Sequence, residues 1–301
     1  MKILLLGANG QVGHELRRSL APLGEVVATT RSGTLDDGIA CEFADFDQPD
    51  SLPALVDRIA PDVVINAAAY TAVDRAETEV QAAFRANAES PGVMASACAS
   101  RGVRLVHFST DYVFPGYGSR PYREDDATSP LGVYGASKLA GEAAIHAAGG
   151  SYLVFRTAWV YASHGHNFLR TMLRLGAERE ELRVVADQIG TPTPAALIAD
   201  VTAEVLAASP QATGTFHLTA EGETSWHGFA TAIFAGAHQR GLLARAPRVL
   251  PITTADYPTP AKRPSYSRLD TSKLRSDFAI TLPAWERGLE RVLDELAGQE
   301  G

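Results

Sequence analysis

The 301-residue sequence is poor in cysteine and contains no long hydrophobic run. Its two cysteines, Cys41 and Cys98, cannot build a disulfide framework and are typical of a protein kept in a reducing compartment. No stretch approaches the roughly 18 apolar residues that a membrane-spanning helix needs. Residues 1–6 imitate the start of a signal peptide, but Gly7 and Gly10 end the apolar stretch too early. We therefore expect a cytoplasmic protein with no membrane partner.

Basic residues are outnumbered by acidic ones, which gives a net charge of −8. A general nucleic-acid binder would need a basic face, so that class is excluded. Residues 240–275 are the exception, with eight basic side chains against Asp256 and Asp270. They form either a solvated basic surface or a pocket for a small polyanion such as a sugar nucleotide diphosphate. The eight are Arg240, Arg245, Arg248, Lys262, Arg263, Arg268, Lys273 and Arg275.

Glycine, in contrast, is concentrated near the start of the chain. The apolar residues 3–6 predict a short buried strand, and Gly7, Gly10 and Gly13 follow at the spacing of a tight turn into the amphipathic residues 11–20. Such a helix presents free N–H groups and a positive dipole end to a pyrophosphate. A dinucleotide site is favoured over an ordinary strand–helix turn because the glycines stand directly between the two elements.

Tyr134 and Lys138 are spaced four residues apart, which places them one turn apart on the same face of a predicted helix. A lysine ammonium in that position lowers the pKa of the phenol, because a nearby cation favours the phenolate. The pair is therefore a candidate general acid for a developing alkoxide.

Strands and helices alternate through the first half of the chain. This order predicts an α/β fold, a Rossmann-like doubly wound parallel sheet, with a smaller C-terminal substrate-binding lobe. We expect residues 1–160 to form an NAD(P)-binding domain completed by parts of 182–220, and residues 161–301 to form mainly the substrate lobe. The predicted strands are 26–29, 39–43, 62–67, 103–108 and 152–157, and the predicted helices are 49–60, 80–100, 134–147 and 283–297. The last helix carries a docking stripe of Trp285, Leu289, Val292, Leu293 and Leu296.

Three further segments end predicted strands at the carboxyl edge of this sheet, where such folds bind ligands. Residues 66–71 are small, residues 109–111 carry two hydroxyls and a carboxylate, and residues 156–161 contain Trp159. A strand end rich in polar groups is costly to bury without partners. Trp159 is suited either to stacking on a sugar or to packing in the core.

Together these motifs resemble the extended short-chain dehydrogenase/reductases, and the segments 156–161, 187–193 and 257–264 narrow the match to the dTDP-4-dehydrorhamnose reductase family. The resemblance runs nearly end to end. It implies reduction of the C4 keto group of dTDP-4-dehydro-6-deoxy-L-mannose, the last step of dTDP-L-rhamnose synthesis for cell-surface polysaccharide. The implied cofactor is NADPH or NADH, and the implied partner is the dTDP-sugar.

The resemblance also implies roles for single residues. Tyr134 is the expected proton donor, Lys138 holds the nicotinamide ribose, and Thr110 hydrogen-bonds the reacting oxygen. Substrate contacts are expected at Thr110, Asp111, Trp159 and Arg263. Cofactor contacts are expected at Gly7, Gly10, Gln11, Val12, Gly13, Arg31, Asp45, Phe46, Ala69, Tyr70, Thr71, Tyr134 and Lys138.

Residues 29–32 favour NADPH. An NAD-preferring enzyme of this fold usually carries an acidic residue there, whereas this chain has Arg31 and no carboxylate. A guanidinium is suited to the 2′-phosphate that distinguishes NADPH.

The eight histidines predict no metal centre, since the closest pair, His164 and His166, lies in a glycine-containing loop and indicates a surface role. A structural Mg²⁺ and a homodimer stay open. Two rival functions also stay open: an epimerase or dehydratase of the same superfamily, and a non-catalytic regulatory subunit of methionine adenosyltransferase. The intact Thr110, Tyr134 and Lys138 argue against the second rival.

Overall fold

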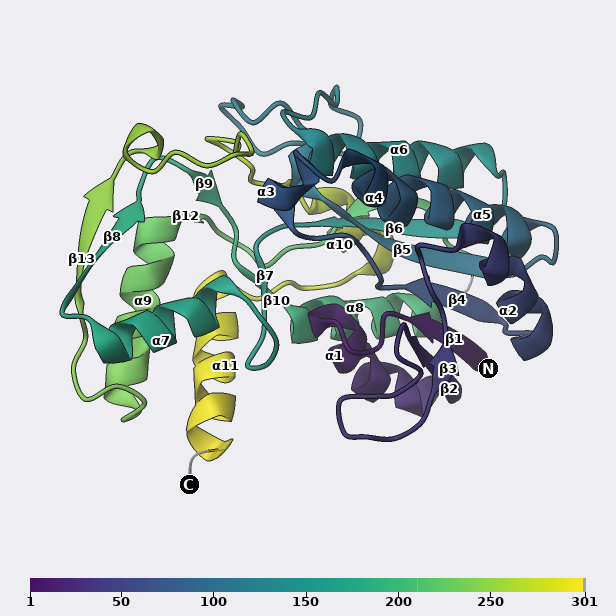
Figure 1. The fold of residues 1–301 in the computed structure, drawn as a ribbon, viewed down its shortest axis with the longest axis horizontal. Coiled ribbons are helices and arrows are strands. Elements are labelled where there is room, and N and C mark those ends of the chain that lie inside the picture. Colours follow the sequence, from purple (N-terminus) through teal and green to yellow (C-terminus); the bar gives the residue numbers. More distant parts are fainter. Residues whose placement is uncertain (210, 300–301) are drawn as a thin grey trace.

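A computed structural model describes residues 1–209 and 211–299, which form two lobes (Figure 1). The larger lobe is built on a parallel sheet of seven strands. Their spatial order is β11 (Gly214–His217), β6 (Tyr152–Thr157), β5 (Arg104–Thr110), β4 (Val63–Asn66), β1 (Lys2–Leu6), β2 (Glu25–Thr30) and β3 (Glu42–Phe43). The order reverses between β1 and β4, which is where doubly wound sheets open a ligand crevice. The predicted fold class is confirmed.

Helices cover both faces of the sheet because successive strand side chains point to opposite sides. Ile3 and Leu5 of β1 join the core beneath one set of helices, and Leu4 and Leu6 join the core beneath the other. The first set is α1 (Gln11–Leu20), α8 (Ala195–Ala208) and α10 (Ser272–Phe278). The second set is α2 (Leu52–Ile59), α5 (Ser90–Ala99) and α6 (Val133–Ala147).

The smaller lobe has its own core and lies on the left of Figure 1. It is formed by α7 (Phe168–Glu178), α9 (Trp226–Gln239), α11 (Trp285–Gln299) and the parallel pair β8 (Glu181–Val185) and β13 (Arg248–Ile252). All five members of the predicted docking stripe on α11 are buried in this core, so that prediction is confirmed. The boundary at residue 160 stays a prediction, and strand β11 and helix α8 of the larger lobe come from beyond it.

The remaining α-helices and β-strands are short. They are α3 (Val73–Ala76), α4 (Val80–Phe84), β7 (Val160–Tyr161), β9 (Ile189–Gly190), β10 (Thr193–Pro194) and β12 (Thr224–Ser225). Strand β7 pairs with β10, and β9 pairs with β12.

Two predicted elements differ from the structure. The strand expected at 39–43 is reduced to Glu42–Phe43, because Ile39 is 60% exposed and its apolar side chain contributes nothing to the core. The helix expected at 80–100 is interrupted by a π-helical turn at Arg85–Glu89 between α4 and α5. Such turns are frequent at functional sites. Among the described residues, no helix is long and apolar enough to cross a membrane.

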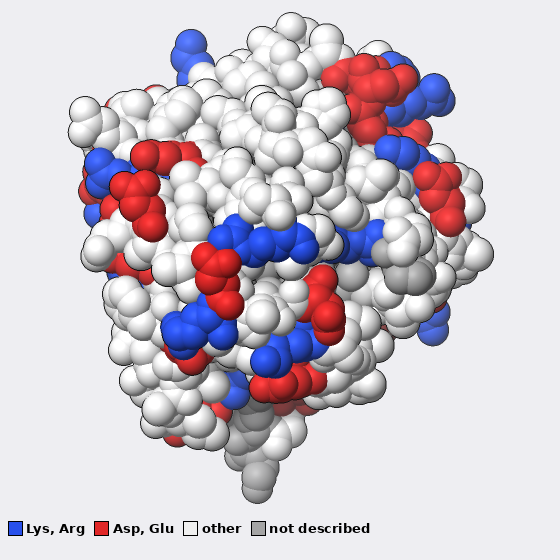
Figure 2. Space-filling model, turned by 90° about the vertical axis from the view of Figure 1, so that its right-hand side faces the viewer, with Lys and Arg blue, Asp and Glu red and all other residues white. Residues whose placement is uncertain are grey.

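Most basic side chains of the segment 240–275 have protein partners, and a pocket for a polyanion there stays a prediction. Six of its arginines are in ion pairs with acidic side chains, most of them far away in the chain, and Lys273 donates to the Thr215 carbonyl at 2.7 Å. The pairs are Arg240–Asp294, Arg245–Glu180, Arg248–Glu181, Arg263–Asp74, Arg268–Glu223 and Arg275–Glu221. On the face shown in Figure 2, too, basic and acidic side chains lie in small mixed groups.

Candidate active site

The glycine turn after β1 is shaped by close backbone contacts. Gly7 has a φ of +77°, and a Cβ at this position would lie 2.6 Å from the backbone nitrogen of Ala68. A Cβ at Gly13 would lie 2.1 Å from the Gly7 carbonyl oxygen, so this glycine lets α1 pack against the turn. Gly10 is the N-cap of α1, and no side chain caps the helix. The turn therefore leaves helix N–H groups for a phosphate, as dinucleotide sites require.

A cavity of about 730 Å³ runs from this turn along the carboxyl edge of the sheet. Its size suits a cofactor-sized ligand. Twelve of the thirteen predicted cofactor residues line it, and the exception is Gly13, which packs behind the wall. The twelve are Gly7, Gly10, Gln11, Val12, Arg31, Asp45, Phe46, Ala69, Tyr70, Thr71, Tyr134 and Lys138. The residues present thus fit a nicotinamide dinucleotide.

Tyr134 and Lys138 reach this cavity from the first turns of α6. Desolvation raises the pKa of Tyr134 to about 12, although a hydrogen bond with Thr110 opposes the shift. Burial lowers the pKa of Lys138 to about 8. The Nζ of Lys138 donates to the Phe108 carbonyl at 2.6 Å and lies 3.2 Å from Nε2 of His107. The predicted lowering of the Tyr134 pKa by Lys138 is therefore absent from this arrangement.

Thr110 and Asp111 lie where β5 ends, beside Tyr134. The Thr110 hydroxyl donates to Asp111 Oδ1 at 3.1 Å and accepts from the Tyr112 N–H at 3.2 Å. Asp111 is only 3% exposed, and burial raises its pKa to about 7. Among the described residues, however, the Ser109 hydroxyl and Asp111 Oδ2 are buried without a hydrogen-bond partner, so the polar strand end is only partly satisfied within the fold.

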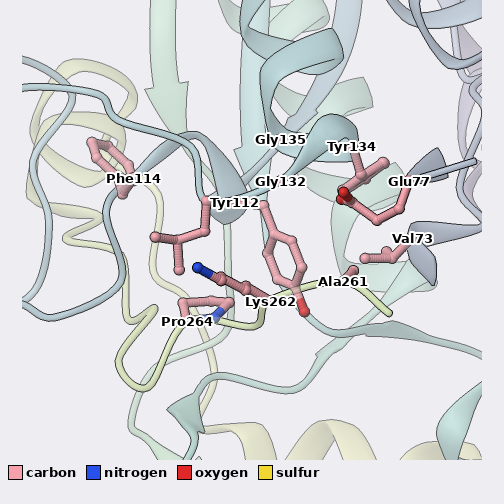
Figure 3. Close-up of a pocket in the computed structure, with 11 residues that line it drawn as sticks. Val73, Glu77, Tyr112, Phe114, Gly132, Tyr134, Gly135, Ala261, Lys262 and Pro264 are labelled. Carbon is pink, nitrogen blue, oxygen red and sulfur yellow. The ribbon is translucent and has the colours of Figure 1, made fainter. Parts of the chain in front are cut away.

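A small hollow of about 10 Å³ lies on the other side of Tyr134 (Figure 3). Tyr112 and Tyr134 meet edge to face there, with ring centroids 5.8 Å apart. Glu77 and Lys262 border the same hollow from distant parts of the chain. Tyr134 therefore stands between the dinucleotide cavity and a space bounded by residues of the segment 261–264.

Two predicted substrate contacts, Trp159 and Arg263, already have partners within the protein. Trp159 stacks on Trp226 with ring centroids 3.5 Å apart, and a Cβ at Gly190 would lie 2.5 Å from the Trp159 ring. Arg263 pairs with both carboxylate oxygens of Asp74 at 3.1 and 2.9 Å. Contact of either side chain with the substrate stays a prediction.

Arg31 lies at the rim of the cavity, with 77% of its side chain exposed. The expectation that no carboxylate stands near it is wrong, because Asp47 Oδ2 lies 3.7 Å from its guanidinium. Asp45 and Asp47 both line the cavity beside it. These acids come from a loop after β3, so residues 29–32 alone do not reveal them.

His164 and His166 are both expected on the surface as a pair. His164 instead packs against residues of α1. Its Nε2 is 3.0 Å from Glu15 Oε1, and its ring centroid is 4.1 Å from that of His14. Among the described residues, these three form one group whose ligand atoms lie within 4.8 Å of one another. Two imidazoles and one carboxylate do not match the all-oxygen shell that Mg²⁺ prefers.

Asn87 is a site residue that the sequence reasoning missed. It is fully buried in the π-helical turn. Its amide accepts from the Tyr70 N–H at 2.8 Å and donates to the Tyr70 carbonyl and the Ser137 hydroxyl at 3.0 Å each. It thereby fixes the cavity wall at Tyr70 to α6. An asparagine in the middle of the predicted helix 80–100 was the available signal.

The chain is similar to known proteins over nearly its whole length. The family described as "RmlD substrate binding domain" matches residues 1–297. The dTDP-4-dehydrorhamnose reductase of Shigella flexneri is 48% identical over 98% of both chains, and that of Burkholderia thailandensis is 49% identical over 99% of this chain and 100% of the relative. The crystal structure of the Bacillus anthracis dTDP-4-dehydrorhamnose reductase in complex with NADP has a TM-score of 0.88 and 36% identity, covering 98% of this chain and 99% of that chain. The chain therefore belongs to the dTDP-4-dehydrorhamnose reductase family.

Proposed function

We propose that this protein uses NADPH to reduce the C4 keto group of dTDP-4-dehydro-6-deoxy-L-mannose, giving dTDP-L-rhamnose in the cytoplasm. The observation that carries the proposal is the position of Tyr134, whose side chain borders both the dinucleotide cavity and the hollow facing segment 261–264. A proton donor at that junction can serve a substrate on one side and a nicotinamide on the other. The relatives' common name, matched over the whole chain, supplies the substrate.

NADPH, when bound, supplies the hydride. The turn at Gly7 and Gly10 would hold its pyrophosphate, and Tyr134 and Lys138 would face its nicotinamide half. The phenol of Tyr134 is protonated at neutral pH because its pKa is about 12, so it has a proton to give to the C4 oxygen. We expect the Thr110 hydroxyl, which now donates to Asp111 Oδ1, to turn its hydrogen bond to the same oxygen as negative charge develops there.

The two rival functions predict different behaviour. An epimerase or dehydratase keeps its cofactor bound and regenerates it in each turnover, whereas a reductase consumes it. A regulatory subunit of methionine adenosyltransferase would show no turnover and would copurify with a second polypeptide. The side chains of Tyr134 and Lys138 that face the cavity support a catalytic role.

The test is to mix the purified protein with NADPH and dTDP-4-dehydro-6-deoxy-L-mannose, following nicotinamide absorbance and sugar-nucleotide products together. We expect one NADPH to be oxidised for each dTDP-L-rhamnose formed. Turnover without net oxidation of NADPH would favour an epimerase. No turnover, with a tightly associated second protein, would favour the regulatory subunit.

A further inference from the structure

Two buried side chains behind the cavity, His107 and Asn66, have no role in the reaction described so far. His107 on β5 is fully buried and lies between Asn66 on the neighbouring strand β4 and Lys138 on α6. Its Nδ1 is 3.0 Å from Asn66 Nδ2, and its Nε2 is 3.2 Å from Lys138 Nζ. Because buried polar atoms need partners, these three side chains constrain the positions of one another's protons.

The backbone fixes the orientation of the Asn66 amide. Asn66 Oδ1 accepts a hydrogen bond from the N–H of Ala68 at 3.0 Å. The amide nitrogen, which can only donate, therefore faces His107. Nδ1 of His107 must accept that hydrogen bond, so it carries no proton; this tautomer is assigned from the hydrogen-bond partners.

The single proton of the neutral imidazole is then on Nε2, which faces Lys138. An ammonium has only hydrogen-bond donors. A charged Lys138 would therefore point an N–H at the Nε2–H of His107, and neither group could accept a hydrogen bond. An uncharged amine has a lone pair that accepts from Nε2–H, while one of its own hydrogens donates to the Phe108 carbonyl at 2.6 Å. The contacts of Lys138 are therefore those of the uncharged amine.

The surroundings act in the same direction. Burial lowers the pKa of Lys138 to about 8 and holds the pKa of His107 well below its usual range. Glu142, on the same helix, favours the ammonium, but Arg156 of β6 pairs with it at 2.7 Å. Tyr134, one turn away, is uncharged at neutral pH because its pKa is about 12.

We propose that His107, held in one tautomer by Asn66, is a positioning residue that stabilises the uncharged form of Lys138, so that Lys138 changes its charge within the working pH range. The inference rests on the proposed function. Lys138 lines the cavity beside Tyr134, so a change in its charge alters the site during turnover and is expected to appear in the pH profile of kcat.

The first test is a pH titration of the cofactor-free protein by NMR, with isotope-labelled lysine and histidine side chains. The chain has four lysines, Lys2, Lys138, Lys262 and Lys273, and Lys138→Met assigns the signal of interest. We expect Lys138 to titrate about two pH units or more below the other three, and His107 to carry its proton on Nε2. A titration midpoint of Lys138 near those of the other lysines, or a proton on Nδ1 of His107, would overturn the proposal.

The second test exchanges the partner that fixes the tautomer. In Asn66→Asp, a carboxylate faces Nδ1 and draws the proton there, so Nε2 becomes an acceptor for a charged Lys138. We expect the titration midpoint of Lys138 to rise by about one pH unit or more. The pH at which kcat declines on the alkaline side should rise with it. An unchanged tautomer with a shifted midpoint would mean that added charge alone acts, and the proposal would fail.

His107→Phe is the companion variant, because it keeps a ring of similar size but has no N–H. We expect the alkaline decline of kcat to move to higher pH in this variant as well. A merely structural role would change kcat or KM and leave the pH of that decline unchanged. If neither variant folds, the wild-type titration decides. The titration needs no substrate, so absence of reductase turnover would defeat the proposed function while leaving this measurement valid.

Discussion

The carboxylate of Asp74, on α3, forms a two-pronged ion pair with the guanidinium of Arg263, which lies 189 residues later in the chain. The pair fastens the segment that carries Ala261 and Lys262 against the larger lobe, next to the hollow at Tyr134. Arg263 therefore helps to shape the substrate side of the site, whether or not it also touches the sugar.

We expect Arg263→Ala and Asp74→Asn to raise the KM for the sugar nucleotide about two- to tenfold, with little change in the KM for NADPH. The reason is that each substitution releases the same segment, and the contacts are partly exposed, so the effect is modest. Steady-state kinetics with each substrate varied in turn checks this. A normal KM in Asp74→Asn with a raised KM in Arg263→Ala would instead indicate direct substrate binding by Arg263.

Tyr134→Phe should lower kcat by about 10²–10⁴, the usual contribution of a general acid. The ring that packs against Tyr112 is retained, so NADPH binding should be nearly unchanged. Stopped-flow rates and fluorescence titration with NADPH measure the two quantities separately. A variant within threefold of the wild-type kcat would remove Tyr134 from the proposed role.

Lys138→Met should raise the KM for NADPH and also stabilise the fold near neutral pH. Burial lowers the pKa of Lys138 from 10.5 to about 8. The ammonium is thus less stable in the folded protein than in the unfolded chain, and below pH 8 its charge lowers the free energy of unfolding. The wild-type free energy of unfolding should therefore rise as pH increases from about 8 to 10.5. At pH 7 we expect the variant to be more stable by about 1–2 kcal/mol, since the lost bond to Phe108 offsets part of the gain. Denaturant unfolding at several pH values checks the sign.

Cofactor choice should depend on Arg31 and Asp47 in opposite directions. The guanidinium is mostly exposed, so Arg31→Ala should raise the KM for NADPH only about three- to tenfold and leave NADH unaffected. Asp47→Asn should lower the KM for NADPH, because it removes a competing anion. Arg58→Ala is the control, since Arg58 pairs with Glu42 and does not line the cavity. Equal preference for both cofactors in the wild type, unchanged in Arg31→Ala, would contradict the account.

Asn87→Ala should destabilise the protein by about 1–3 kcal/mol, because it leaves the backbone of Tyr70 without its buried partners. It should also raise the KM for NADPH, since Tyr70 lines the cavity. Thermal unfolding and NADPH titration of the same preparation test both effects. Loss of stability with unchanged NADPH binding would limit Asn87 to a structural role.

The sequence predicts local features of this site well and long-range ones poorly. The glycine turn at Gly7–Gly13 and the Tyr134–Lys138 spacing are local, so chain order and helical periodicity suffice to place them. The contact between Asn66 and His107 depends on the register between β4 and β5, and the partners of the basic segment come from distant parts of the chain. The π-helical turn that buries Asn87 breaks the 3.6-residue period, so the apolar pattern of residues 80–100 does not show it.

The central claim is that hydride reaches C4 of the sugar in a site where Tyr134 supplies the proton. The most direct measurement uses NADPH carrying deuterium at both C4 positions of the nicotinamide, with dTDP-4-dehydro-6-deoxy-L-mannose as the second substrate. The account predicts dTDP-L-rhamnose with one deuterium at its C4, formed by the wild type and greatly slowed in Tyr134→Phe. Product without deuterium, or equal rates in the two proteins, would contradict it.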